Sequence, residues 1–329
     1  MTTLALVNAT DLVAEEFRAA LEERHDLWNA MRLFTTEEDA VGTLVDVRGG
    51  AGMVVAVEDG SFDDVDIALF FGEPSSYRNL LASVPPAATT ILVTGKDPLP
   101  EAGQPGVVGV NLHDLDRFET LVHPHSAAVG IAQLLRPLLP LNPRSASATA
   151  VLPVSFFGKE ALDELLDQAR DLLSFSTQVE ADLLPGPLAF NVLDSPTGRL
   201  ITDQARAALG EDAPPLAVQA VQGGLFHGLG LALQITFEDE TLDAERLTEV
   251  LEGSSLLDFA ADPEQLGPKE VVGRLEVMIS EIRPLGEGIF ALWAVLDPLT
   301  AGGSRNLLAM LESLKNPHST AGSGAALTH

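Results

Sequence analysis

The apolar residues of this chain follow two different patterns, and the change between them constrains the fold more than any other feature of the sequence. In the first part, short runs of consecutive apolar residues alternate with polar or helix-like stretches. A strand that is apolar at every position has both faces buried, which is typical of a parallel sheet covered by helices. The runs are residues 4–7, 53–57, 67–71, 90–93 and 107–110, and a helical pattern with Leu12, Val13, Phe17, Ala20 and Leu21 on one face follows the first.

The second part alternates apolar and polar residues instead. Residues 229–237 keep a strict period of two, and residues 272–282 and 289–296 look similar. This period is typical of antiparallel strands with one buried face. An apolar stripe over residues 161–174 predicts a long helix, and Leu307, Leu308, Leu311 and Leu314 predict a last one. The fold class is therefore α/β, with a Rossmann-like parallel-sheet domain followed by an α+β domain whose sheet is mainly antiparallel.

Two domains also suit a chain of 329 residues, because a single core rarely grows beyond roughly 250 to 300 residues. Its 48 acidic and 19 basic residues give a net charge of −29, a field that repels nucleic acids and anionic membranes. No apolar run approaches the roughly 18 residues that span a bilayer, and the first residues do not look like a signal peptide. We expect a cytoplasmic protein with no nucleic-acid or membrane partner.

The chain contains no cysteine. This excludes disulfides, thiolate metal sites and any covalent step at a protein thiol. Histidine and aspartate residues do gather within residues 113–125, but solvated polar loops commonly have this composition, and we predict no metal site.

Several short segments, taken in order, resemble the aspartate-semialdehyde dehydrogenase family. Residues 121–138 resemble the segment in which that family has Asn-Pro-Asn-Cys-Ser-Thr and then a helix. Further matches are Val154-Ser155 with Gly158, residues 189–192, residues 272–274, and residues 292–297 before Gly302-Gly303. Residues 8–14 resemble the family's Gly-Ala-Thr-Gly-x-Val-Gly turn. Gln222 before Gly223-Gly224 is similar to the non-biosynthetic Usg-type branch, which has Gln where true dehydrogenases have an Arg.

The resemblance implies a degenerate NADP-binding domain of residues 1–125 plus 300–315, and a second domain of residues 126–299 that carries the active site and a dimer interface. Residues 316–329 are small, polar and rich in Gly and Ser, so we predict a disordered tail.

The family's chemistry begins at a cysteine thiolate, and the matching residue here is Ser126. A serine hydroxyl needs a positioned base and would form an ester that phosphate displaces poorly. Leu152 stands at the family's glutamine, Gln222 at the substrate-binding Arg, and Leu229 at the catalytic His. His227 lies two residues earlier and, within a strand, would share a face with that position. The family has a further helix with substrate-binding residues, and of these residues this chain keeps only Arg206.

The cofactor turn is similarly altered. Asn8, Asp11 and Ala14 occupy the three positions at which a dinucleotide turn needs glycine, with Thr10 between the first two. Asp11 places a carboxylate where a phosphate should bind, and it suits a helix N-cap better. Pro298 replaces an Asn that contacts the nicotinamide in the family. We therefore expect no bound NADP.

These losses favour a catalytically inactive scaffold, regulatory or interaction protein that pairs with itself or with a related protein. Two alternatives stay open: an NADP-dependent aldehyde oxidoreductase with altered chemistry, and a hydrolase with Ser126 as nucleophile and His123, His125 or His227 as base. Because no Gly-x-Ser-x-Gly pattern surrounds Ser126, a helix cap is the favoured role for this residue. A third hypothesis is an anion-sensing module that uses Arg206.

Overall fold

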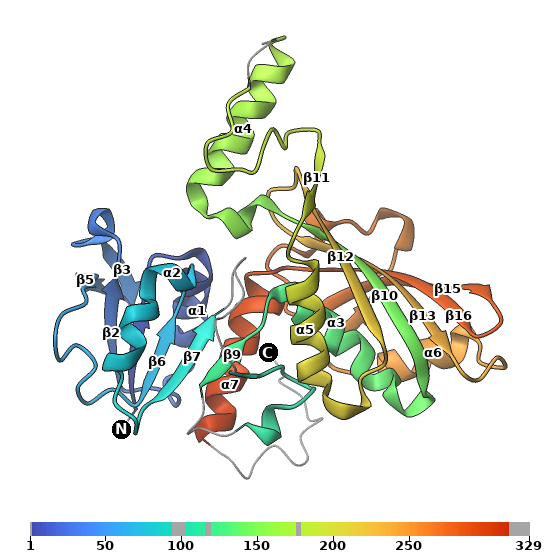
Figure 1. Ribbon diagram of the computed structural model, residues 1–329, viewed down its shortest axis with the longest axis horizontal. Coiled ribbons are helices and arrows are strands. Elements are labelled where there is room, and N and C mark those ends of the chain that lie inside the picture. Colours follow the sequence, from blue (N-terminus) through green and yellow to red (C-terminus); the bar gives the residue numbers. More distant parts are fainter. Residues whose placement is uncertain (1, 94–102, 116–119, 176–178, 316–329) are drawn as a thin grey trace. The chain divides into compact units, whose positions relative to one another are not determined.

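The computed structural model describes residues 2–93, 103–115, 120–175 and 179–315, so the predicted disordered tail lies outside the described residues. The chain divides into two compact units. Unit 1 comprises Met1–His125 and Gly303–His329, and unit 2 comprises Ser126–Gly302. The predicted fold class is confirmed, with a parallel sheet in unit 1 and a mainly antiparallel sheet in unit 2 (Figure 1).

The sheet of unit 1 has the strand order β5-β2-β1-β6-β7-β9-β8, and all its pairs are parallel. Its strands are β1 (Thr3–Val7), β2 (Ala30–Thr35), β5 (Val55–Ala56), β6 (Ile67–Phe70), β7 (Thr89–Val93), β8 (Gln104–Pro105) and β9 (Leu121–His123). A separate hairpin joins β3 (Leu44–Val47) to β4 (Gly50–Met53). The helices are α1 (Leu12–Glu22), α2 (Pro74–Tyr77) and α7 (Arg305–Lys315).

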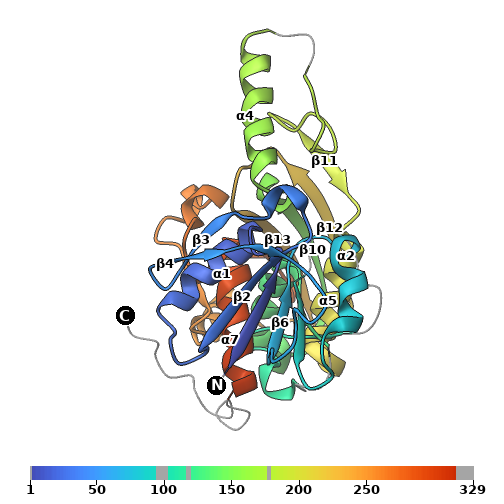
Figure 2. The ribbon, with the colours of Figure 1, turned by 90° about the vertical axis from the view of Figure 1, so that its left-hand side faces the viewer.

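The apolar run of β1 is explained by two cores. Leu4 and Leu6 belong to the core beneath α1 and α7, whereas Ala5 and Val7 belong to the core on the other face of the sheet. Figure 2 shows α1 and α7 on the same side of this sheet, and an Arg24–Glu312 ion pair links the end of α1 to α7.

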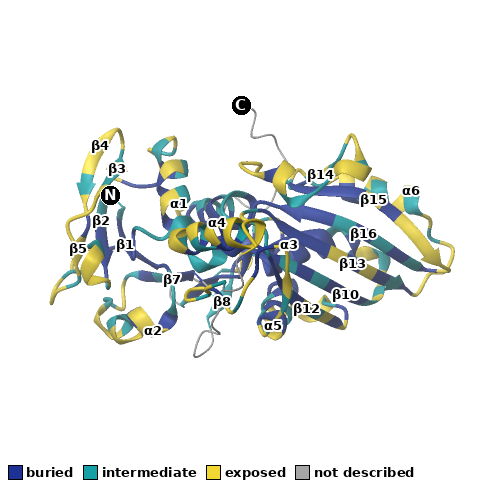
Figure 3. Ribbon diagram, turned by 90° about the horizontal axis from the view of Figure 1, so that it is seen from above, coloured by how far each residue is buried: buried dark blue, intermediate teal, exposed yellow. Residues whose placement is uncertain are grey.

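Unit 2 has the strand order β11-β12-β10-β13-β16-β15-β14. These strands are β10 (Pro143–Leu152), β11 (Val192–Ser195), β12 (Leu216–Gly223), β13 (Leu229–Phe237), β14 (Leu257–Phe259), β15 (Val277–Gly286) and β16 (Ile289–Leu296), and the helices are α3 (Ser126–Leu135), α4 (Lys159–Leu173), α5 (Gly198–Leu209) and α6 (Ala244–Glu252). Buried and exposed residues alternate along β10 and β13, as the period of two predicts (Figure 3).

Three predicted strands are wrong in whole or in part. Residues 107–110 form a turn, although Val107 and Val110 are buried in it. The run at 53–57 is divided between the end of β4 and the two-residue β5. The strand expected from residue 272 begins only at Val277, because Gly273 adopts a φ of +79° in a turn and donates its N–H to Asp297 Oδ2. At residues 107–110 the apolar character reports burial but not the backbone conformation, whereas Met53, Val55 and Val272 are exposed, so there the apolar residues indicated neither. Among the described residues, no helix is long and apolar enough to cross a membrane.

Tyr77 provides a test of packing in unit 1. Its ring is fully buried against Phe70, with ring centroids 5.2 Å apart, and its hydroxyl has no hydrogen-bond partner among the described residues. Burial, with a smaller effect of Glu73, raises the pKa of Tyr77 well above its ordinary value. An unsatisfied buried polar group costs free energy.

We therefore expect Tyr77→Phe to raise the free energy of unfolding by about 1 kcal/mol, measured by urea denaturation. A lower free energy of unfolding would show that the hydroxyl makes a favourable interaction that the structure does not describe.

Candidate functional site

A first candidate site lies where the strand order of unit 1 reverses. From β1 the chain adds β2 on one side and later β6 on the other. Ligands of open α/β sheets bind in the crevice beyond the carboxyl ends of such strands. The residues after β1 therefore decide whether a dinucleotide can bind.

Asn8 fills this crevice. Its Nδ2 donates to the carbonyl oxygen of Phe71 (2.9 Å) and to Ser76 Oγ (3.1 Å), while its Oδ1 accepts from the N–H (2.9 Å) and hydroxyl (2.8 Å) of Thr36. The side chain is buried, and the backbone has a φ of +59°, a left-handed conformation that Asn tolerates better than most residues. A single amide thus joins the segments that follow β1, β2 and β6.

Three further backbone N–H groups of the turn, those of Ala9, Asp11 and Val13, also bond within the protein. The N–H of Ala9 donates to the carbonyl oxygen of Phe34 (3.0 Å), and the N–H of Asp11 donates to the carbonyl oxygen of Asn8 (3.0 Å). Asp11 caps α1, as predicted, because its Oδ1 accepts from the N–H of Val13 (2.8 Å). Thr10 lies half-buried between these residues.

An acidic side chain of the protein itself occupies the N-terminus of α1. Burial of the carboxyl group raises the pKa of Asp11, hydrogen bonds from Val13 and Ala14 lower it, and nearby Glu37 raises it further. The helix N-terminus, which attracts anions, therefore already holds a carboxylate of the chain.

A second candidate site is in unit 2, at Ser126. This residue is 5% exposed and is the first residue of α3. Its hydroxyl donates to the carbonyl oxygen of Pro298 (2.9 Å), and Gly302 packs so closely that a Cβ there would be 2.5 Å from the Cβ of Ser126. The hydroxyl proton thus goes to a carbonyl distant in sequence, while the predicted capping role of the hydroxyl oxygen stays a prediction.

Gln222 and Leu152 are direct neighbours. They are paired in the register of β12 and β10, and Gln222 Nε2 donates to the carbonyl oxygen of Leu152 (2.9 Å). Both side chains are buried. The amide at the family's substrate-arginine position therefore binds the protein backbone.

Neither remaining candidate joins this group. Arg206 is exposed on α5, whose buried face is formed by Ile201, Ala205, Ala208 and Leu209. His227 lies in the loop before β13, which begins only at Leu229. The expectation that a two-residue shift within a strand would place His227 at the catalytic position is therefore wrong.

The two histidines proposed as alternative bases are buried. His123 Nε2 donates to the carbonyl oxygen of Gly303 (3.2 Å), and desolvation lowers the pKa of this ring to about 4. Desolvation, with a smaller effect of His123, also lowers the pKa of His125 to about 4. Such weakly basic rings accept a proton poorly near neutral pH. No group of three or more His, Asp or Glu side chains within the described residues could hold a metal ion.

The sequence pattern missed the positive role of Asn8, which was interpreted only as a lost glycine. The available signal was the preference of Asn for left-handed backbone. Its partners Thr36 and Ser76 had no signal in the sequence, because they are brought together only by the sheet.

No protein-family model matches the chain. It is 26% identical to a USG-1 protein homolog of Pseudomonas aeruginosa and 28% identical to that of Azotobacter vinelandii, each over 94% of this chain and 97% of the relative. It is 26% identical to aspartate-semialdehyde dehydrogenase of Bacillus subtilis, over 95% of this chain and 97% of the enzyme. The predicted family resemblance, including its Usg branch, is confirmed.

Solved structures of aspartate-semialdehyde dehydrogenases share the fold. A probable aspartate-semialdehyde dehydrogenase from Pseudomonas aeruginosa gives a TM-score of 0.87 at 24% identity, covering 95% of this chain and 98% of the other. Aspartate semialdehyde dehydrogenase II from Vibrio cholerae, complexed with ASA, gives 0.84 at 20% identity, covering 97% and 99%. The aspartate-semialdehyde dehydrogenase scaffold is thus present along nearly the whole chain.

The raised pKa of Asp11 predicts a pH effect. An acid whose pKa is higher in the folded than in the unfolded state binds its proton more tightly when folded, so its contribution to stability falls as pH rises from about 3.8. Asn caps helices as well as Asp but carries no charge. We expect Asp11→Asn to have a higher melting temperature than the wild type at pH 7 to 8, with the difference shrinking towards pH 4.

Asp243→Asn is the matched control, because Asp243 caps α6 through the N–H of Arg246 (2.8 Å) but is exposed. The interpretation fails if the two variants show the same pH profile.

Proposed function

We propose that this chain is a catalytically inactive relative of aspartate-semialdehyde dehydrogenase that acts as a dimeric scaffold or regulatory protein. One observation carries the proposal. At three positions where the enzyme needs a group for cofactor, nucleophile or substrate, the residue present donates a hydrogen bond to a backbone carbonyl of the chain itself: Asn8 to Phe71, Ser126 to Pro298, and Gln222 to Leu152.

The residues of unit 1 do not fit NADP. A dinucleotide turn leaves backbone N–H groups available for the pyrophosphate, but those of Ala9, Asp11 and Val13 have partners within the protein. The carboxylate of Asp11 repels phosphate, and the exposed Glu37, Glu38 and Asp39 after β2 stand where a 2′-phosphate calls for a cation.

The residues of unit 2 do not fit the chemistry of the family. Ser126 has its proton directed at a carbonyl oxygen, which is not a base that could remove it. Gln222 has no charge to pair with a substrate carboxylate. A hydrolase is disfavoured for the same reason, since the hydroxyl is held and His123 and His125 are weak bases.

The direct test combines NADP(H) calorimetry with an assay of phosphate-dependent oxidation of aspartate semialdehyde. We expect no NADP(H) binding and no turnover, in the wild type and in Ser126→Cys, because the thiol alone restores neither the cofactor turn nor the substrate cation. The Bacillus subtilis enzyme serves as the positive control. Turnover by Ser126→Cys near that of the control would overturn the proposal.

Pairing is supported by the sheet of unit 2. The outward residues of its four central strands are uncharged, and the strand register places them on one face: Ser147, Thr149, Ala217, Gln219, Ala232, Gln234 and Ala291. Most are exposed. This uncharged patch ends at β15, where the exposed Arg283 pairs with Ala291, and a patch of this kind is suited to packing against a second sheet. A two-fold pair, with itself or with a related protein of the same fold, would bury it.

We expect the 34.7 kDa chain to sediment as a homodimer and Ala232→Glu, at the centre of this face, to sediment as a monomer. Ala207→Glu on the exposed side of α5 adds the same charge elsewhere and should leave the dimer intact. A wild-type monomer at tens of micromolar concentration would contradict homodimerisation and leave pairing with a related protein as the form to be tested.

A further inference from the structure

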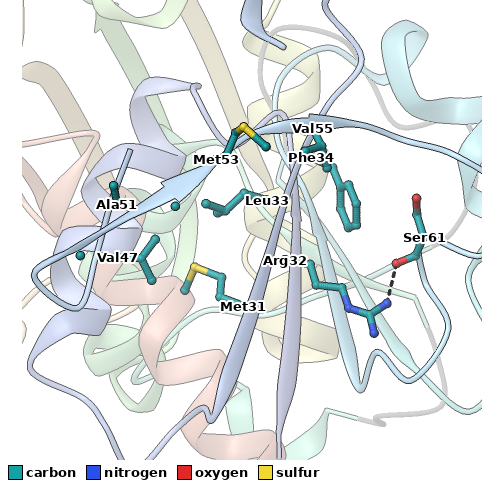
Figure 4. A pocket seen from close by; sticks show the side chains of 11 residues that line it. Met31, Arg32, Leu33, Phe34, Val47, Ala51, Met53, Val55 and Ser61 are labelled. Carbon is teal, nitrogen blue, oxygen red and sulfur yellow. Dashed lines mark hydrogen bonds between the residues drawn. The ribbon is translucent and has the colours of Figure 1, made fainter. Parts of the chain in front are cut away.

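A hollow of about 570 Å³ lies in unit 1 between the outer edge of β2 and the β3–β4 hairpin (Figure 4). We call it the edge slot. Its lining is mostly apolar and consists of Met31, Arg32, Leu33, Phe34, Val47, Gly50, Ala51, Gly52, Met53, Val55 and Ser61.

The edge slot contains an open strand edge. Ala30 donates its N–H to Thr2, and Phe34 accepts from Ala9, so these residues direct their main-chain groups towards β1. Because neighbouring residues of a strand direct these groups to opposite sides, Met31 and Leu33 direct theirs to the outer edge. Within the described residues, β5 is the strand that pairs with β2 on that side, and it does so only at Phe34 and Thr35.

The hairpin that forms the other wall is held in place. The Arg48 guanidinium lies 3.7 Å from the centroid of the Trp28 ring and donates to the carbonyl of Trp28 (2.7 Å), and Arg18 donates to the carbonyl of Asp46 (2.8 Å). A Cβ at Gly52 would lie 2.6 Å from Leu33 Cδ1, so β4 rests directly on that side chain. The wall of the edge slot is therefore fixed by specific contacts within unit 1.

Large apolar side chains are exposed at and beside the slot. Met53 is 58% exposed and Leu44 66%, and Val41 and Val55 are also exposed. Native proteins usually protect an open strand edge from pairing with other chains by means of charged residues, proline or a covering segment. Exposed apolar side chains beside an open edge are typical of an interaction site.

The charge of the residues around the edge slot indicates what kind of segment would bind there. Residues 30–66 contain nine acidic and two basic residues, and both guanidinium groups are engaged, Arg32 with the carbonyl of Ser61 and Arg48 with Trp28. Glu58 and Asp59 are exposed between Val55 and Ser61, which both line the slot. Two copies of this acidic edge would repel each other, whereas a basic segment would be attracted.

We propose that the edge slot binds an extended segment of a partner protein in which apolar residues alternate with Lys or Arg. The segment adds a strand to β2 at Met31 and Leu33, places apolar side chains against Leu33 and Met53, and directs its basic side chains towards the acidic rim.

The test uses the full chain and two labelled ten-residue peptides, one alternating Val with Lys and one alternating Val with Glu, with binding followed by fluorescence anisotropy. We expect only the basic peptide to bind, and Met53→Lys to weaken it by about tenfold or more. Leu285→Lys is the matched control, because Leu285 is 59% exposed in unit 2 and the change in net charge is the same. It should change the affinity by less than about twofold.

Hydrogen exchange separates strand addition from attraction by charge alone. Bound basic peptide should slow exchange at the amide of Leu33, and Met31→Pro, which removes an outward N–H without touching the ladder to β1, should weaken binding. The proposal is overturned if neither peptide binds, if the two Lys variants weaken binding equally, or if the amide of Leu33 is unaffected. It is also overturned if the chain alone forms a dimer that Met53→Lys, but not Ala232→Glu, dissociates.

Discussion

The four hydrogen bonds of the Asn8 amide are the interaction on which the architecture of unit 1 depends. A parallel sheet is held together by its ladders only as far as its strands reach, and the segments beyond the carboxyl ends need other partners. The side chain of Asn8 is a hydrogen-bond partner that the segments after β1, β2 and β6 share, since Phe71, Ser76 and Thr36 all bond to it. A buried amide with every polar atom satisfied rigidifies its surroundings, because moving any one segment leaves a buried group unpaired.

In a dinucleotide-binding protein the same crevice is kept open by glycines, and the ligand completes the hydrogen bonding. Here the protein completes it. This substitution of internal bonds for ligand bonds recurs in unit 2, where Ser126 and Gln222 bond to backbone carbonyls. These internal hydrogen bonds are independent of the apolar pattern of both sheets, so a fold can keep its core while the residues at its site change.

The sequence predicted the fold where the apolar period was unambiguous. The bounds of β13 and β16 agree with the predicted 229–237 and 289–296, because a period of two with one buried face fixes both position and register. The pattern failed at residues 107–110, since a buried turn is as apolar as a buried strand. At the site, a position-by-position comparison with the family identified which groups are missing. It did not identify what replaces them, because the partners of Asn8, Ser126 and Gln222 lie 28 to 172 residues away along the chain and become neighbours only through the sheets.

The charge near the cofactor turn also bears on the surface beyond β2. A protein that binds a 2′-phosphate needs positive charge near the carboxyl end of that strand. This chain has Glu37, Glu38 and Asp39 there, and Glu37 contributes to the raised pKa of Asp11 within the turn. In a protein that binds no anion here, as we propose, negative charge can accumulate along this side of the sheet without cost to ligand binding. The acidic rim around the open edge of β2 is then compatible with the closed cofactor turn, and both favour a cationic partner over an anionic ligand in this unit.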